Sequence, residues 1–278
     1  MKKIVFTLSA LLLIMLGSLQ SKKGTSGIEF GIHSASESAD NKPELRKLKN
    51  TAFKKGEVLR YKLHYGLLEA GVAELSIKDV KTKKGRHAFH IVGTGNSVGM
   101  FNWFYKVEDR YETFLDTTAI VPWEHIRDVS EGGYEINHHV FFNQFHNYAE
   151  SAGNYYAVPP NVQDILSAFY YSRTYDASTL RIGDEIEIVT FLDHEVWPMK
   201  LKFLGRGNVK SEVGTIPCMK FMPVIQVGRV FKDQEGMTIW VSDDQNKIPI
   251  LLQTDLLIGS IKMSITGYEN LRKPLRKI

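Results

Sequence analysis

Histidine and carboxylate side chains are the residues of this chain best suited to hold a metal ion or to transfer protons. The densest of its 9 histidines are His138, His139 and His146. His138 and His139 are adjacent in an alternating, strand-like stretch, where neighbouring side chains point to opposite faces, so the two would not share a metal ion. The sequence has neither an HExxH motif nor a cysteine cluster. We therefore predict no metal site and no cofactor.

Motifs for other kinds of catalysis are equally sparse. The G-x-S-x-G motif, which carries the nucleophilic serine of many hydrolases, is absent. A Ser-His-Asp triad can be assembled from distant residues and leaves no local signature. The glycine-rich stretch 93–99 is not clearly followed by the helix that a phosphate-binding loop requires. Asp243 and Asp244 precede an Asn-Lys-Ile-Pro sequence, which is typical of a hairpin turn. No catalytic residue is predicted.

Aromatic residues offer the best candidate for binding. We predict a ligand-binding group that consists of Phe101, Trp103, Phe104, Tyr105, Tyr170 and Arg173. If these aromatic rings line a groove, they would bind an apolar or glycan ligand; if they are exposed, they would dock on lipid or on another protein. The alternative is that they pack inward as core. Arg173 would meet an anionic group of the ligand, or pair with Asp164, Asp109 or Glu108 inside the fold.

Strands must position these residues, because short segments with a period of two follow one another along the chain. Residues 58–65 and 72–80 alternate in this way, and lysine- and glycine-rich turns such as 83–85 separate the segments. We predict a mainly β protein, built as an antiparallel open or closed barrel or as two curved sheets. Residues 161–174 break the pattern and predict one main helix, with Asn161 as its cap after Pro159 and Pro160.

A shift of 127 residues superimposes several turn residues. It places Gly56 on Gly183, each followed by an acid and a strand-like stretch, and Pro122 on Pro249. Turn residues would be retained by a shared backbone path. We predict that modules at 53–150 and 180–270 arose by internal duplication and are joined by the helix; coincidence among common turn residues is the alternative.

The first residues resemble an export signal. Lys2 and Lys3 precede thirteen residues without charge or proline, a length typical of a secretory signal and too short for a membrane span. We predict a signal peptide at 1–21, a flexible linker at 22–50, a β-rich domain at 51–272 and a basic tail at 273–278. Without the signal the net charge falls from +4 to +2, which does not suggest a nucleic-acid partner. No later apolar run could span a membrane, and the only cysteine, Cys218, is expected to be buried and inert.

Five short motifs in a fixed order resemble a bacterial family known as domain of unknown function 3108. They are Gly56–Tyr61 (GEVLRY), Glu69–Ala73 (EAGVA), Tyr105–Asp109 (YKVED), Gln163–Arg173 (QDILSAFYYSR) and Ile239–Asp244 (IWVSDD) with Ile248-Pro249. The resemblance covers residues 53–268 and implies an exported, β-rich protein of the periplasm of a Gram-negative bacterium. It implies no activity and no catalytic residue.

Three functions are compatible with these features. The signal peptide, the barrel-like pattern and the aromatic stretch favour non-enzymatic binding of a lipid, a glycolipid or an envelope protein partner. A structural or assembly factor of the cell envelope is the second hypothesis. A hydrolase of envelope polymers is the third, and it requires titratable groups that converge in a cleft.

Overall fold

The computed structural model describes residues 44–224, 237–255 and 259–278. The predicted signal peptide and residues 22–43 of the predicted linker lie outside this part of the chain. In the described part the protein is mainly β, as predicted, with 14 strands and two helices, α2 (Gly99–Phe104) and α3 (Ile165–Ser172). The strands are β1 (Val58–Tyr65), β2 (Leu68–Lys83), β3 (Arg86–Ser97), β4 (Val107–Asp116), β5 (Pro122–Glu131), β6 (Tyr134–Asn143), β7 (Tyr148–Ser151), β8 (Asn154–Ala157), β9 (Glu185–Leu192), β10 (Glu195–Ser211), β11 (Gly214–Pro223), β12 (Met237–Ser242), β13 (Pro249–Asp255) and β14 (Ser260–Glu269).

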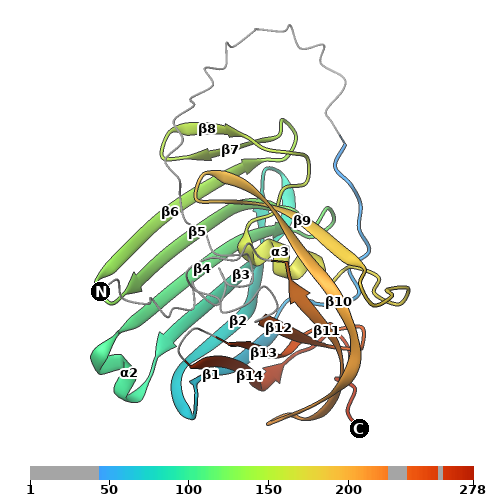
Figure 1. Ribbon diagram of the computed structural model, residues 1–278. Coiled ribbons are helices and arrows are strands. Elements are labelled where there is room, and N and C mark those ends of the chain that lie inside the picture. Colours follow the sequence, from blue (N-terminus) through green and yellow to red (C-terminus); the bar gives the residue numbers. More distant parts are fainter. Residues whose placement is uncertain (1–43, 225–236, 256–258) are drawn as a thin grey trace, which may run out of the picture.

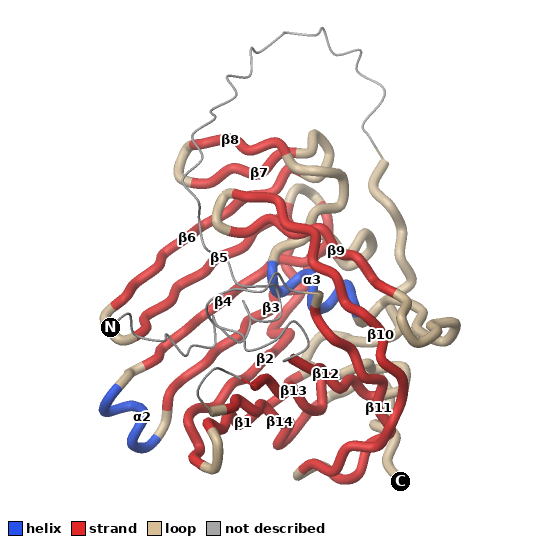
Figure 2. Tube along the Cα trace, in the orientation of Figure 1, coloured by secondary structure: helices blue, strands red, loops and turns tan. Residues whose placement is uncertain are grey.

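All 14 strands form one antiparallel sheet, and the first strand, β1, lies inside this sheet rather than at an edge. β1 pairs with β14, and two meanders lead outward from this pair, one through β2 to β8 and the other through β13 to β9. The sheet curls strongly around α3 (Figures 1 and 2). It remains open, because β8 and β9 are its two ends and are not paired with each other. Of the predicted alternatives, the open arrangement is therefore correct and two separate sheets are not formed.

Alternating burial explains why these segments are strands. In β4, for example, Val107, Tyr111 and Leu115 are buried while Glu108 and Arg110 are exposed. A strand with this pattern can pack one face on a core and leave the other in water. The inner faces of the strands therefore surround α3, and the outer faces carry most of the charged side chains.

The helix begins later than predicted. Asp164, rather than Asn161, is its cap: the Asp164 carboxylate accepts hydrogen bonds from the backbone N–H groups of Leu166 (2.8 Å) and Ser167 (2.9 Å). The Ser167 hydroxyl accepts in return from the Asp164 N–H (2.7 Å), which completes a capping box. Residues before Asp164 are not helical because Gln163 pairs with β9, where its N–H donates to the carbonyl of Val189.

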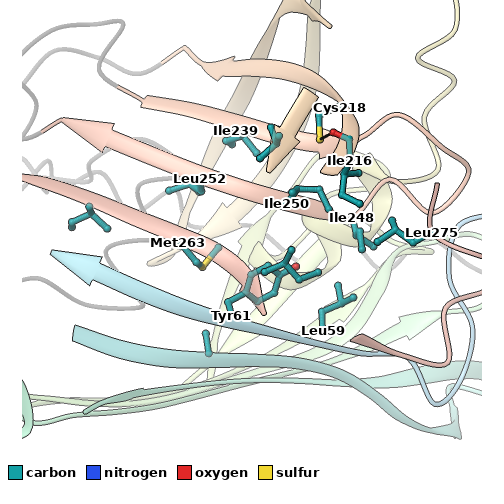
Figure 3. Close-up of a cluster of buried hydrophobic side chains, with 14 residues drawn as sticks. Leu59, Tyr61, Ile216, Cys218, Ile239, Ile248, Ile250, Leu252, Met263 and Leu275 are labelled. Carbon is teal, nitrogen blue, oxygen red and sulfur yellow. Dashed lines mark hydrogen bonds between the residues drawn. The ribbon is translucent and has the colours of Figure 1, made fainter. Parts of the chain in front are cut away.

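Helix α3 packs against both arms of the sheet, where one arm is β1–β8 and the other is β9–β14. Leu166 and Tyr170 are buried in a cluster with residues of β2 to β5. Ala168, on another side of the helix, is buried with residues of β9, β10 and β11. A third cluster joins β1 to β11–β14 and includes Leu59 and Ile250 (Figure 3). Helix α3 therefore packs between the two arms of the curled sheet.

A buried ion pair fixes the end of α3. The guanidinium of Arg173 donates to both carboxylate oxygens of Glu57, at 2.6 and 2.8 Å, and both residues are at most 1% exposed. Arg173 Nε also donates to the carbonyl of Asn246 (2.9 Å) in the β12–β13 turn. The partner differs from the predicted Asp164, Asp109 or Glu108, because β1 rather than β4 begins beside this end of the helix.

The flanking segments pack more closely on the domain than predicted. Arg46, in the predicted linker, donates to the carbonyls of Ala119 and Ile120 at 2.9 Å. In the basic tail, Leu275 is buried in the cluster around β1, and the N–H of Ile278 donates to the carbonyl of Thr215. Residues 44–50 and 273–278 are thus held by hydrogen bonds and apolar contacts that sequence composition does not reveal.

Strand positions agree with the shift of 127 residues. β9, β10 and β13 begin 127 residues after β1, β2 and β5, and β11 and β14 begin within one residue of that shift after β3 and β6. Gly56 and Gly183, which precede β1 and β9, both have positive φ angles, +84° and +100°. Duplication as the origin of this correspondence stays a prediction.

Replacing Arg173 by methionine should lower the free energy of unfolding by about 3–5 kcal/mol, because it leaves the Glu57 carboxylate buried without its partner. Urea unfolding followed by circular dichroism measures this. Arg110→Met is the matched control: Arg110 is exposed and pairs with Glu112 at the surface, so the loss should stay below about 1 kcal/mol.

A double variant separates the ion pair from general packing. Arg173→Met with Glu57→Leu removes both charges, so it should recover part of the stability lost in the single variant. An Arg173→Met protein as stable as the wild type would show that the pair is not a structural constraint.

Candidate functional site

A mostly apolar pocket lies between α3 and the inner surface of β9–β13. It encloses about 810 Å³ of empty space, a figure that includes the solvent at its open side. The helix contributes Ile165, Ala168 and Phe169 to the lining. The strands contribute Ile186, Met199, Leu201, Met219, Phe221, Ile239, Val241 and Pro249.

Polar groups in the lining come from two neighbouring places. Ser172, Arg173 and Tyr175 lie at the end of α3 and just after it, and Lys247 belongs to the β12–β13 turn. The charge of Arg173 is matched by Glu57, and the Ser172 hydroxyl donates to the carbonyl of Phe169 (2.7 Å). The pocket therefore has apolar walls and a polar rim, an arrangement that suits a ligand with an apolar body and a polar end.

The predicted ligand-binding residues do not form one group. Tyr170 is 0% exposed and packs edge-to-face on Phe53, so its ring belongs to the core. Arg173 lines the pocket. Phe101, Trp103 and Phe104 lie in α2, and Tyr105 follows it, at a distant end of the sheet (Figure 1). The grouping remains a prediction, and the structure places its members at two separate locations.

The exposed end of the sheet around α2 is strongly apolar. None of the residues of α2 is buried; Trp103 is 80% and Phe104 is 68% exposed, with their ring centroids 4.6 Å apart. The β1–β2 turn lies beside α2, since Gly71 at the start of β2 pairs with Ser97 at the end of β3. This turn exposes Leu67 and Leu68. We call Leu67, Leu68, Met100, Trp103 and Phe104 the α2 tip.

Histidines and carboxylates meet elsewhere, in pairs that stabilise the fold. Under the start of α3, Thr113 Oγ1 lies 2.9 Å from the capping carboxylate of Asp164 and 3.0 Å from His125 Nδ1. Burial lowers the pKa of His125, although the carboxylate of Asp164 opposes this, so the neutral imidazole is favoured. None of the three residues lines the pocket. The cluster holds the cap of α3 in place.

The β9–β10 turn carries a second group of titratable side chains. Asp193 accepts from Arg127 Nη1 at 2.8 Å and lies 3.8 Å from His138 Nδ1, while the ring of His194 stacks on Tyr156. These contacts join the turn to β5–β8. Across the described residues, no three histidine, cysteine or acidic side chains are placed to hold a metal ion.

The pocket was missed in the sequence for a physical reason. Its walls come from alternating strand residues such as Met199, Phe221 and Ile239, which look like ordinary core positions when the sequence is read alone. Lys247 lies in a turn, where a lysine is unremarkable. Only the curl of the sheet around α3 shows that these side chains face unfilled space.

Similar proteins give a family but no activity. The fold is β-rich and open, and the chain belongs to the family described as Protein of unknown function (DUF3108), whose model matches residues 60–266. No curated protein matches the sequence significantly. Among solved structures, a β-barrel-like protein of the DUF1849 family from Brucella abortus matches at 8% identity and a TM-score of 0.48, over 81% of this chain and 99% of the other. A duf1089 family protein from Pseudomonas aeruginosa matches at 9% identity and a TM-score of 0.38, over 67% of this chain and 90% of the other.

None of the helices in the described ranges is long and apolar enough to cross a bilayer.

Cys218 should be unreactive in the folded protein. The residue is 1% exposed, and burial raises the pKa of its thiol to about 12, so the reactive thiolate is scarce at neutral and mildly alkaline pH. Titration with a disulfide reagent should therefore modify the thiol only after urea is added. Rapid modification of the native protein would contradict its burial against Ile216 and its neighbours.

Proposed function

We propose that this is an exported envelope protein of a Gram-negative bacterium that binds the apolar part of a lipid or glycolipid without catalysing a reaction. The observation that carries the proposal is the apolar pocket between α3 and β9–β13, which is open on one side. The signal-like first residues support the periplasm as its compartment.

The chemistry of the lining favours an aliphatic ligand. Each methylene moved from water into such a pocket contributes about 0.8 kcal/mol. Met199 and Met219, from adjacent strands, supply flexible thioether side chains that adapt to irregular apolar shapes. Aromatic side chains in the lining are few, which suits an acyl chain better than a stack of sugar rings.

Hydrolysis of envelope polymers has weaker support. A hydrolase needs titratable groups that converge on a cleft where substrate can bind. His138 does lie near Asp193, but Arg127 already donates to that carboxylate, and these residues do not line the pocket. Among the residues that the structure describes, the lining of the pocket contains no carboxylate and no histidine.

Filling the pocket should weaken binding of an apolar ligand. The wild type is expected to enhance the fluorescence of the neutral dye phenylnaphthylamine, and Ala168→Phe or Val241→Phe should weaken this binding about 10-fold or more, because either ring occupies the cavity. Asn154→Phe, at the exposed β7–β8 turn, is the control and should bind like the wild type.

Two pocket variants are made, so that the test does not depend on a single variant that fails to fold. Val241 is only partly buried and so tolerates enlargement better than Ala168. If correctly folded Ala168→Phe and Val241→Phe proteins, as judged by circular dichroism, bind the dye as the wild type does, the pocket is not the binding site. A wild type that does not bind the dye would contradict the proposal.

A second candidate function rests on the α2 tip. Large apolar side chains exposed together at one end of a sheet are typical of surfaces that dock on a membrane or a partner protein, and aromatic residues are favoured at the membrane interface. This surface fits an assembly factor of the envelope as well as a lipid carrier. It is separate from the pocket, so the two candidates can be tested independently.

Removing the aromatic rings of the tip should affect docking alone. We expect Trp103→Ser with Phe104→Ser to reduce sedimentation with phosphatidylcholine vesicles while leaving dye binding unchanged. The stability should change by less than about 0.5 kcal/mol, because neither ring is buried. Tyr155→Ser, equally exposed on β8, is the control. Unchanged sedimentation of the double variant would argue against membrane docking and favour a protein partner.

A further inference from the structure

We propose that Lys247 is the recognition site for an anionic head group, so that the pocket takes single-chain amphiphiles with a carboxylate or phosphate at one end. This inference rests on the proposed binding function and specifies the ligand. It is carried by the position of Lys247 in the lining of an otherwise apolar pocket.

The turn that carries Lys247 is rigidly built. The Asp244 carboxylate accepts hydrogen bonds from the backbone N–H groups of Asn246 (2.9 Å) and Lys247 (3.2 Å). Asn246 in turn exchanges two hydrogen bonds with the backbone of Lys273. Lys247 itself has a φ of +47°, a left-handed conformation that residues other than glycine adopt infrequently. The turn therefore fixes the origin of the Lys247 side chain at the pocket.

The charges around the rim leave Lys247 available. Arg173, the other cation in the lining, is held by Glu57, and Asp243 pairs with Arg206 at 3.1 Å. Asp244 is occupied by the backbone of its own turn. Asp176 is close enough to attract Lys247, but no carboxylate lies within ion-pair distance of it among the residues that the structure describes.

Burial of Lys247 has an electrostatic cost that an anionic ligand would offset. Desolvation lowers the pKa of Lys247, and the attraction of Asp176 and Asp244 only partly opposes this. A partly desolvated ammonium forms stronger charge-assisted hydrogen bonds than one in water. An anion beside Lys247 would therefore gain more than it would at an exposed lysine.

The shape of the site then defines the ligand. The apolar chain would lie against β9–β12 and α3, and its charged end would meet Lys247 at the polar rim. A free anion lacks the apolar contacts, and a neutral amphiphile lacks the ion pair. We therefore expect an anionic amphiphile to bind more tightly than either a free anion or a neutral amphiphile.

Competition with the dye tests the inference. We expect hexadecanoate to displace phenylnaphthylamine from the wild type more effectively than hexadecanol, and inorganic phosphate not to displace it. Lys247→Ala should weaken hexadecanoate binding on the order of 10-fold and leave hexadecanol unchanged. Lys247→Arg should retain most of the preference, whereas Lys247→Glu should reverse it in favour of hexadecylamine. Lys220→Ala, which removes a lysine outside the pocket lining, should behave like the wild type.

The outcomes separate this inference from the proposed function. If the dye binds and Ala168→Phe prevents it, but Lys247→Ala leaves the ratio of hexadecanoate to hexadecanol affinity unchanged, the head-group assignment is overturned and the pocket remains. If the wild type binds no dye, the proposed function itself fails. Displacement by inorganic phosphate alone would show an anion site that does not depend on an apolar chain.

Discussion

The ion pair between Arg173 and Glu57 constrains most of this architecture. A buried guanidinium is tolerated only when its charge is matched and its donors are satisfied. Here the donors reach the segment just before β1 through Glu57 and Ala52, and the β12–β13 turn through the carbonyl of Asn246. Asn246 extends the network to the C-terminal segment. One side chain therefore fixes the end of α3 to both arms of the sheet, and it also positions the turn that carries Lys247.

The open sheet follows from what lies in the chain between two series of six strands, β1–β6 and β9–β14. β14, the last strand of the second series, pairs with β1, the first strand of the other. A symmetrical arrangement would pair β6 with β9 and close the sheet. Instead β7 occupies the edge of β6, and Gln163 occupies the edge of β9. The intervening segment thus keeps the sheet open, and it supplies α3, which packs inside the sheet and forms one wall of the pocket.

Sequence patterns predicted what depends on local physics. The period of two predicted the strands, and the break after Pro160 predicted the helix, although pairing of Gln163 with β9 moved its start to Ile165. Long-range contacts were beyond such patterns: nothing local relates Arg173 to Glu57, 116 residues away, and composition suggested free flanks where Arg46 and Leu275 are held. The aromatic residues were recognised as unusual, but their separation into Tyr170 in the core and Trp103 at the tip depends on the curl of the sheet.

The pocket and the α2 tip lie at opposite ends of the strands that connect them. Tyr65, beside the tip, pairs with Ile261 at the start of β14. The start of β14 follows the C-terminal end of β13, so the tip lies toward that end of β13. Pro249, at the N-terminal end of β13, lines the pocket together with Lys247. A head group at Lys247 would consequently lie at the end of β13 opposite the α2 tip. The proposed docking surface and the proposed ligand site therefore consist of different side chains, so that each can be altered without changing the other.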